Sequence, residues 1–78
     1  MDIQNFLDMF SSLFEVTPED ELRAGTMYKS LDEWDSMMAL ETIAMVDEEY
    51  NIGLDGDDIR GTDTISDLFE IVKTRMNA

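Results

Sequence analysis

The chain contains neither cysteine nor histidine among its 78 residues. Without cysteine it has no disulfides and no thiolate metal sites. Without histidine it lacks the usual general base for a serine nucleophile. Basic residues are also scarce, because 5 Lys and Arg stand against 19 Asp and Glu, a formal net charge of −14. This charge repels nucleic acids and anionic membranes, so we expect neither as a partner, and it attracts basic protein surfaces.

Long apolar runs are missing as well. No stretch approaches the roughly 18 apolar residues of a membrane span. The first residues, "MDIQNFLDMF", have no basic region of the kind that opens a signal peptide, and acids interrupt the apolar ones. We therefore expect a cytoplasmic protein that begins at its own methionine. The length predicts a single domain over residues 1–78, and we expect a monomer.

Apolar residues recur at helical spacing in three segments. The first helix is capped by Asp2 and should end around Val16 and Pro18. The second starts at Asp35-Ser36 and runs to about Tyr50. The last opens at Thr64. Their inward positions are predicted to be Ile3, Phe6, Leu7, Phe10, Leu13 and Phe14 in the first helix, Ala39, Ile43, Val46 and Tyr50 in the second, and Ile65, Leu68, Phe69, Val72 and Met76 in the last.

The connecting segments complete the predicted architecture. Residues 17–34 should form a long ordered loop whose apolar side chains are buried, namely Leu22, Met27, Tyr28, Leu31 and Trp34. Asn51 and Gly53 are typical of a helix end, and residues 57–60 should form one short helical turn. No strand pattern or repeat is present. The sequence thus predicts an all-α fold, a small antiparallel bundle of three main helices plus one short helix.

The second helix carries more apolar surface than one core face requires. Met37, Leu40 and Ala44 lie on a stripe well away from the predicted core stripe, and Glu41 and Glu48 flank it. Exposed Met and Leu bordered by acids are typical of an adaptable protein-docking surface. Met45, in contrast, is predicted to fill the core.

Ser36 opens this helix and has three interpretations: a catalytic nucleophile, a helix cap, or a group that another enzyme modifies. Catalysis is disfavoured, because there is no histidine and neither lysine lies in a Ser-Lys motif. Asp35 and Ser36 both suit a helix start, yet capping explains neither the preceding Trp34 nor the following apolar face. Modification uses all of these features. The positive helix N-terminus favours a phosphodiester on the serine, and the adjacent apolar and acidic helix gives a modifying enzyme a surface to bind.

The stretch "LDEWDSMMALETIAMVDEEYNIGLDGDDI" resembles the acyl carrier protein family, whose signature is Asp-Ser-Leu followed by an amphipathic helix that ends in acids and an aromatic residue. The preceding "GTMYKSLDEWDS" is similar to a family variant with Phe at the position of Tyr28. The resemblance covers essentially the whole chain. It implies a helical bundle in which Ser36 receives 4′-phosphopantetheine from coenzyme A, with Asp35 in a supporting role.

The resemblance also implies the partners. A Mg²⁺-dependent phosphopantetheinyl transferase would modify Ser36, a ligase would load an acyl or aminoacyl group as a thioester, and a downstream transferase or synthase would accept it. The chain itself would not be an enzyme. Met37, Leu40, Glu41, Ala44 and Glu48 would dock these proteins. The family often has an acid at the position of Met38, and this departure suggests a stand-alone carrier of a specialised pathway rather than of fatty-acid synthesis.

Two other interpretations concern the acidic residues. A carrier-like helical module that is never modified, and that simply binds a basic protein, would show the same acidic and apolar face. The segment "DGDDIRGTDTISD" resembles a calcium loop, but an EF-hand starting at Asp55 would place Ile59, Arg60 and Ser66 where an acid, Gly and Glu are required. We therefore expect no metal site.

Overall fold

The computed structural model describes residues 2–77, which form four α-helices and no strand. The all-α prediction of three main helices and one short helix is confirmed. The helices are α1 (Ile3–Ser11), α2 (Ser36–Tyr50), α3 (Gly56–Arg60) and α4 (Ile65–Met76), and two short 3₁₀ turns, Glu19–Glu21 and Tyr28–Ser30, interrupt the long connection between α1 and α2.

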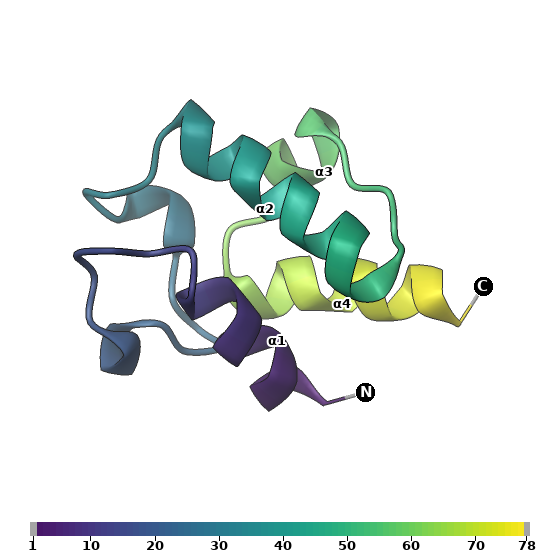
Figure 1. Ribbon diagram of the computed structural model, residues 1–78, viewed down its shortest axis with the longest axis horizontal. Coiled ribbons are helices and arrows are strands. Elements are labelled where there is room, and N and C mark those ends of the chain that lie inside the picture. The colour runs from purple at the N-terminus through teal and green to yellow at the C-terminus, as the bar shows by residue number, and fades with distance from the viewer. Residues whose placement is uncertain (1, 78) are drawn as a thin grey trace.

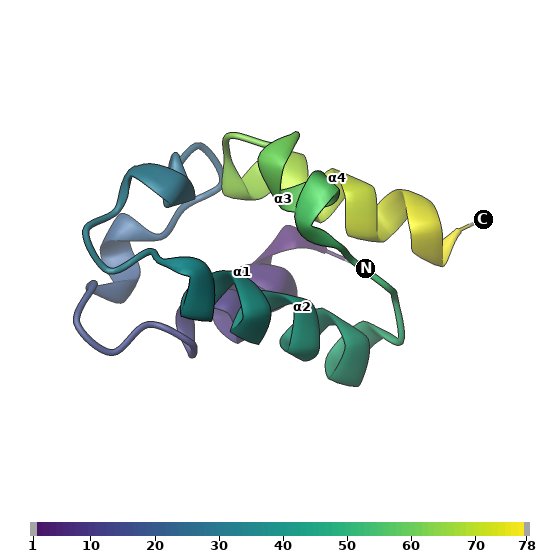
Figure 2. The same cartoon turned by 90° about the horizontal axis from the view of Figure 1, so that it is seen from above.

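The helices pack so that α1 contacts both α2 and α4, and α3 lies against α4. Figures 1 and 2 show α1 running opposite to α2 and α4, which share one general direction. The connection between α1 and α2 gathers at one end of the bundle, beside the first turn of α2. The predicted ordered loop is therefore next to the helix that begins with Ser36.

The first helix is shorter than its apolar pattern predicts. Asp2 caps it by accepting a hydrogen bond from the Asn5 amide at 3.0 Å, as expected. The helix ends at Ser11 rather than near Val16. The hydroxyls of Ser11 and Ser12 donate to the carbonyls of Asp8 and Met9, at 3.1 and 2.6 Å. Such local bonds compete with continuation of the helix. A tighter turn follows, and it places Phe14 in the core.

The boundaries of the later helices follow the sequence signals closely. α2 begins at Ser36 and ends at Tyr50, and its C-cap Asn51 adopts the left-handed conformation with φ 56°. At the start of α4, the Thr64 side chain accepts from the Asp67 amide while the Asp67 carboxylate accepts from the Thr64 amide. This reciprocal capping box satisfies two amides that a helix start otherwise leaves without a partner.

The core is rich in aromatic rings from separate elements. Phe6 and Phe10 of α1 are fully buried, and the Phe10 ring meets Tyr28 edge-on, with centroids 5.7 Å apart. Tyr28 in turn shares a 2.5 Å hydrogen bond with the buried hydroxyl of Thr62. The fully or nearly buried apolar residues are Phe6, Phe10, Phe14, Leu22, Tyr28, Met38, Met45, Val46, Leu54, Ile59, Ile65, Leu68, Phe69 and Val72.

Two predicted core residues are exposed instead. Met27 is 55% exposed and Met76 is 45% exposed. Met27 directly precedes the turn that directs Tyr28 inward, so its own side chain faces solvent. Met76 is the last residue of α4, and this end of the helix projects beyond the other helices (Figure 1).

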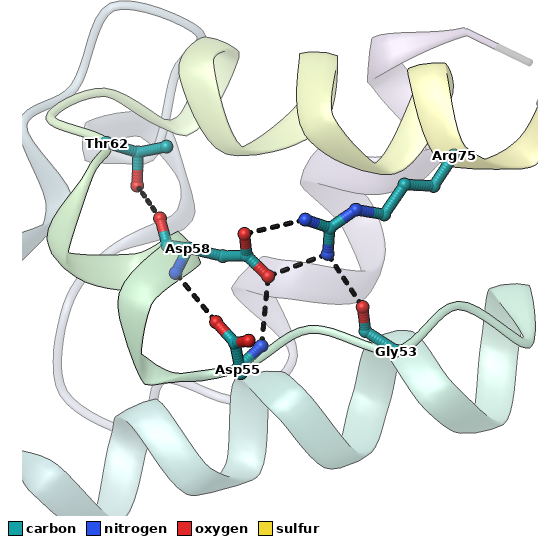
Figure 3. Close-up of polar contacts among 5 residues, drawn as sticks. All are labelled: Gly53, Asp55, Asp58, Thr62 and Arg75. Atoms are coloured by element: carbon teal, nitrogen blue, oxygen red, sulfur yellow. Dashed lines mark hydrogen bonds and ion pairs between the residues drawn. The ribbon is translucent and has the colours of Figure 1, made fainter.

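Arg75 fastens α4 to the segment that follows α2. Its guanidinium donates to both oxygens of the Asp58 carboxylate, each at 2.7 Å, and to the carbonyl of Gly53 at 2.8 Å (Figure 3). These bonds to Arg75 are the main reason that the pKa of Asp58 lies below its ordinary value. Asp58 also closes the capping box of α3 with Asp55, so one carboxylate links three parts of the chain.

The end of α2 offers a direct test of the backbone geometry. Alanine resists the left-handed conformation of Asn51, so Asn51→Ala should lower the free energy of unfolding by about 1 kcal/mol. Asn51→Gly should leave it unchanged or raise it slightly, because glycine adopts this conformation without strain. Urea unfolding of the three proteins measures both differences. Equal stability of the alanine and glycine variants would contradict the assigned helix end.

Candidate functional site

Ser36 is the first residue of α2, and its side chain is exposed. Asp35 is the N-cap of the helix, and its carboxylate accepts a 2.8 Å hydrogen bond from the Met38 amide. No hydrogen bond within residues 2–77 involves the Ser36 hydroxyl. The serine is therefore presented to solvent on a helix start that Asp35 holds in place.

The first turn of α2 differs from those of α3 and α4. In both of those helices an aspartate at the third position completes a capping box, through Asp58 and Asp67. The third residue of α2 is Met38, which cannot accept a hydrogen bond in this way. In the part of the chain that the structure describes, the amides of Ser36 and Met37 have no hydrogen-bond partner. Free amides and the helix dipole at this point favour a negatively charged group.

The predicted docking residues all lie on the solvent side of α2. Met37 and Leu40 are each 63% exposed, and Glu41, Ala44 and Glu48 are exposed as well. Their positions, separated by steps of three and four residues, place them along one side of the helix. We call Met37, Leu40, Glu41, Ala44 and Glu48 the α2 stripe. It starts immediately after Ser36.

The inward face of α2 differs in part from its prediction. Val46 is fully buried as expected, but Ala39, Ile43 and Tyr50 are only half-buried. The residues that face the core are instead Met38, Thr42, Met45 and Val46. The Thr42 hydroxyl donates to the Met38 carbonyl at 2.8 Å, which allows this polar side chain to be buried. The core face is therefore rotated toward Met38 and Met45.

Met38 is consequently a core residue. Its side chain is only 6% exposed and belongs to the buried apolar cluster. A side chain directed inward offers no surface to a partner protein at this position. The prediction for Met45 as a core residue is confirmed by its burial.

A polar contact that the sequence does not reveal lies just before Ser36. The Glu33 carboxylate accepts hydrogen bonds from the amides of Glu15, Val16 and Thr17, at 2.6, 3.0 and 2.8 Å. It also accepts from the Thr17 hydroxyl at 3.0 Å. We call this arrangement the Glu33 clamp. No local pattern signals it, since its partners are 16 to 18 residues away in the chain.

The clamp shifts the protonation of Glu33 strongly. Its hydrogen bonds, of which that from the Glu15 amide contributes most, lower the pKa of Glu33 from 4.5 to about 2. Each of these bonds favours the ionised form, because a carboxylate accepts hydrogen bonds more strongly than a carboxylic acid does. Glu33 therefore stays charged across the whole neutral and mildly acidic range.

Trp34 and a groove complete the surroundings of the serine. The Trp34 ring meets Tyr28 edge-on with centroids 4.9 Å apart, and it also lies near Phe10 and Phe14. A groove of about 260 Å³ runs beside the first turn of α2, and it is lined by Leu13, Glu15, Glu33, Asp35, Met37, Met38 and Glu41. Glu33 also borders a larger hollow of about 540 Å³ formed by residues 16–18, 21 and 30–33.

Within residues 2–77, no group of three or more Asp and Glu side chains is placed to hold a metal ion. In the same range, every helix is too short or too polar to cross a membrane. Comparisons with protein-family models, with curated proteins and with solved structures found no match to this chain.

The lowered pKa of Glu33 predicts a pH dependence. A carboxylate with a depressed pKa stabilises the fold fully above its unfolded value near 4.5, and this contribution is lost as the pH falls toward 2. Glu33→Gln lacks the contribution, so its melting temperature should lie below that of the wild type at pH 7. The gap should close between pH 4.5 and 2, as followed by thermal melts.

Asp32→Asn is the control for this measurement. It removes the same charge one residue away, and within residues 2–77 its carboxylate accepts no hydrogen bond. Relief of repulsion among the many acids should affect both variants alike, and the lowered pKa values of Asp58 and Asp67 are common to all three proteins. A difference in melting temperature between the wild type and Glu33→Gln that is the same at pH 7 and pH 2 would contradict the clamp.

Proposed function

We propose that this chain is a carrier protein that bears 4′-phosphopantetheine on Ser36 and passes thioester-linked acyl or aminoacyl groups between partner enzymes. The observation that carries the proposal is the placement of Ser36. Its exposed hydroxyl opens α2, beside two free amides, and the α2 stripe follows directly. This is the arrangement that a modifying enzyme needs, because it offers a reachable nucleophile and an adjacent surface to bind.

The residues at this site suit the proposed group. On modification, the Ser36 oxygen would lose its proton to a base of the transferase and form a bond to phosphorus, while the bond from that phosphorus to the nucleotide part of coenzyme A would break and release the nucleotide. The amides of Ser36 and Met37 would be the donors available to the resulting phosphodiester, and the helix dipole would favour its negative charge. When attached, the arm supplies a thiol to a chain that has no cysteine.

The lack of a hydrogen-bonded base for Ser36 supports a carrier more than a hydrolase. A serine nucleophile requires a base within hydrogen-bond reach, and the structure shows no hydrogen bond from Ser36 to any described group. A hydroxyl without an internal partner is instead suited to an enzyme that brings its own base. The phosphopantetheinyl transferase, the loading ligase and the downstream transferase or synthase would each supply chemistry that this chain lacks.

The α2 stripe supports transient, electrostatically guided encounters with these partners. Glu41 and Glu48 are exposed and, within residues 2–77, form no ion pair. A basic surface on a partner would be attracted by these charges and would bury Met37 and Leu40, and salt should weaken the attraction. The phosphopantetheine arm attached to Ser36 would then enter the partner's active site.

Modification of Ser36 is the first prediction of this proposal. Incubation with coenzyme A, Mg²⁺ and a broad-specificity phosphopantetheinyl transferase should add the mass of one phosphopantetheine to the intact chain. Ser36→Ala should gain nothing, whereas Ser30→Ala, which removes another exposed serine, should be modified like the wild type. If several transferases leave the wild-type mass unchanged, the carrier proposal is wrong.

One alternative function draws on the same α2 stripe. An unmodified acidic module would bind a basic protein through Met37, Leu40 and the neighbouring acids without any use of Ser36. Ser36→Ala distinguishes the two proposals once a partner is known. The variant should abolish the transfer of a thioester-linked group by a carrier, but it should leave binding by an unmodified module intact.

The docking role of α2 can be tested by comparing two exposed methionines. Met37 is 63% exposed on the stripe, and Met27 is 55% exposed in the loop. Neither Met37→Ala nor Met27→Ala should change the free energy of unfolding by more than about 0.5 kcal/mol, because both side chains are largely in water. Met37→Ala should raise the transferase KM for the carrier several-fold, and Met27→Ala should not. Equal effects of the two substitutions would remove the α2 stripe from the proposal.

A further inference from the structure

The Glu33 clamp joins two segments of the chain that are far apart in the sequence. Both carboxylate oxygens of Glu33 are engaged: one accepts from the Glu15 amide, and the other accepts from the amides of Val16 and Thr17 and from the Thr17 hydroxyl. Three consecutive amides that have left α1 are thus held by a side chain three residues before Ser36. In the described part of the chain, no other carboxylate joins segments in this way through several backbone amides.

The two residues between Glu33 and Ser36 are also fixed by their side chains. The ring of Trp34 packs against Tyr28, Phe10 and Phe14, and its amide donates to the Leu31 carbonyl at 3.0 Å. Asp35 caps α2 through the Met38 amide. Each of the three residues before the serine therefore makes a specific side-chain contact, whereas the Ser36 hydroxyl makes no hydrogen bond within residues 2–77.

We propose that Glu33 is a positioning residue for the modification of Ser36, an inference that rests on the proposed carrier function. The clamp sets the direction from which the chain enters α2, and Asp35 then closes the helix start. Without the clamp, residues 15–17 lose their only polar attachment to the segment before α2. The turn at Trp34 and Asp35 then adopts several conformations, and only a fraction of the molecules presents Ser36 correctly to a transferase.

The expected kinetic effect follows from this population argument. When only a fraction of the molecules is competent to bind, the apparent affinity falls in proportion to that fraction. The bound complex is unchanged, so the saturated rate is not affected. Loss of the clamp should therefore raise KM for the carrier substrate and leave kcat nearly constant.

The structural half of the inference is tested on the unmodified chain by amide hydrogen exchange. Glu33→Ala should accelerate exchange at residues 15–17 and also, by about tenfold, at the Met38 amide that Asp35 caps, because local opening controls exchange. Asp32→Asn, which removes an adjacent charge without touching the clamp, should exchange like the wild type at all these positions. Acceleration confined to residues 15–17 would overturn the inference.

The functional half uses a purified phosphopantetheinyl transferase with coenzyme A. Glu33→Ala should raise the KM for the carrier by about tenfold, with kcat within about twofold of the wild type. Glu33→Gln keeps one carbonyl oxygen as an acceptor, so its KM should lie between those of the wild type and Glu33→Ala. A KM for Glu33→Ala equal to that of Asp32→Asn would overturn the inference even if the wild type is modified normally.

The two experiments separate the failure of this inference from the failure of the proposed function. If no transferase modifies the wild type, the carrier proposal falls, and the exchange experiment still decides whether Glu33 orders the start of α2. If Glu33→Ala does not fold, Glu33→Gln takes its place in both experiments, since it retains the size of the side chain. Wild-type exchange at Met38 in a folded Glu33→Gln variant would then count against the inference.

Discussion

The carboxylate of Glu33 is the contact on which the geometry around Ser36 depends. It joins two segments that are 16 to 18 residues apart in the chain and that regular secondary structure does not connect. The core holds the neighbouring Trp34 by aromatic packing, but packing alone leaves the direction of the backbone before α2 free. Hydrogen bonds to three successive amides remove that freedom, since each requires a defined orientation of donor and acceptor. In a small domain without disulfides, one charged side chain thus joins the two ends of the longest connection.

The helices of this fold are predictable because their signals are local. Asp35, Asn51 and Thr64 mark helix ends through bonds or conformations that involve only the next few residues, and the structure has all three where the sequence places them. The exposure of Met37 and Leu40 follows equally from helical spacing. The fold class and the surface next to Ser36 were therefore accessible from the sequence, because they depend on periodicity and capping rather than on distant contacts.

The remaining features depend on contacts that have no local pattern. The Glu33 clamp spans the long loop, and the Arg75–Asp58 pair connects α4 to α3 across 17 residues; among 19 acids, neither acid is distinguished by its neighbours in sequence. The predicted core face of α2 was only partly right for a related reason. Helical spacing ranks Ile43 above Thr42, but it cannot show that the Thr42 hydroxyl finds an acceptor at the Met38 carbonyl and is buried at little cost.

The acidic composition has a structural part and a surface part, and the division bears on function. Asp2, Asp35 and Asp55 cap three helices, and Glu33 accepts from the loop, so these charges lie close to backbone amides that offset them. Glu41 and Glu48 have no such partners among the described residues, and they remain free to act at a distance. A chain of net charge −14 can fold because many of its carboxylates stabilise helix starts and turns. At the start of α2, as at the start of α1, no acid follows the capping aspartate in the first turn, and among the described residues the amides of Ser36 and Met37 have no hydrogen-bond partner. The start of α2 thus has room for a negatively charged group on Ser36, as the proposed phosphodiester requires.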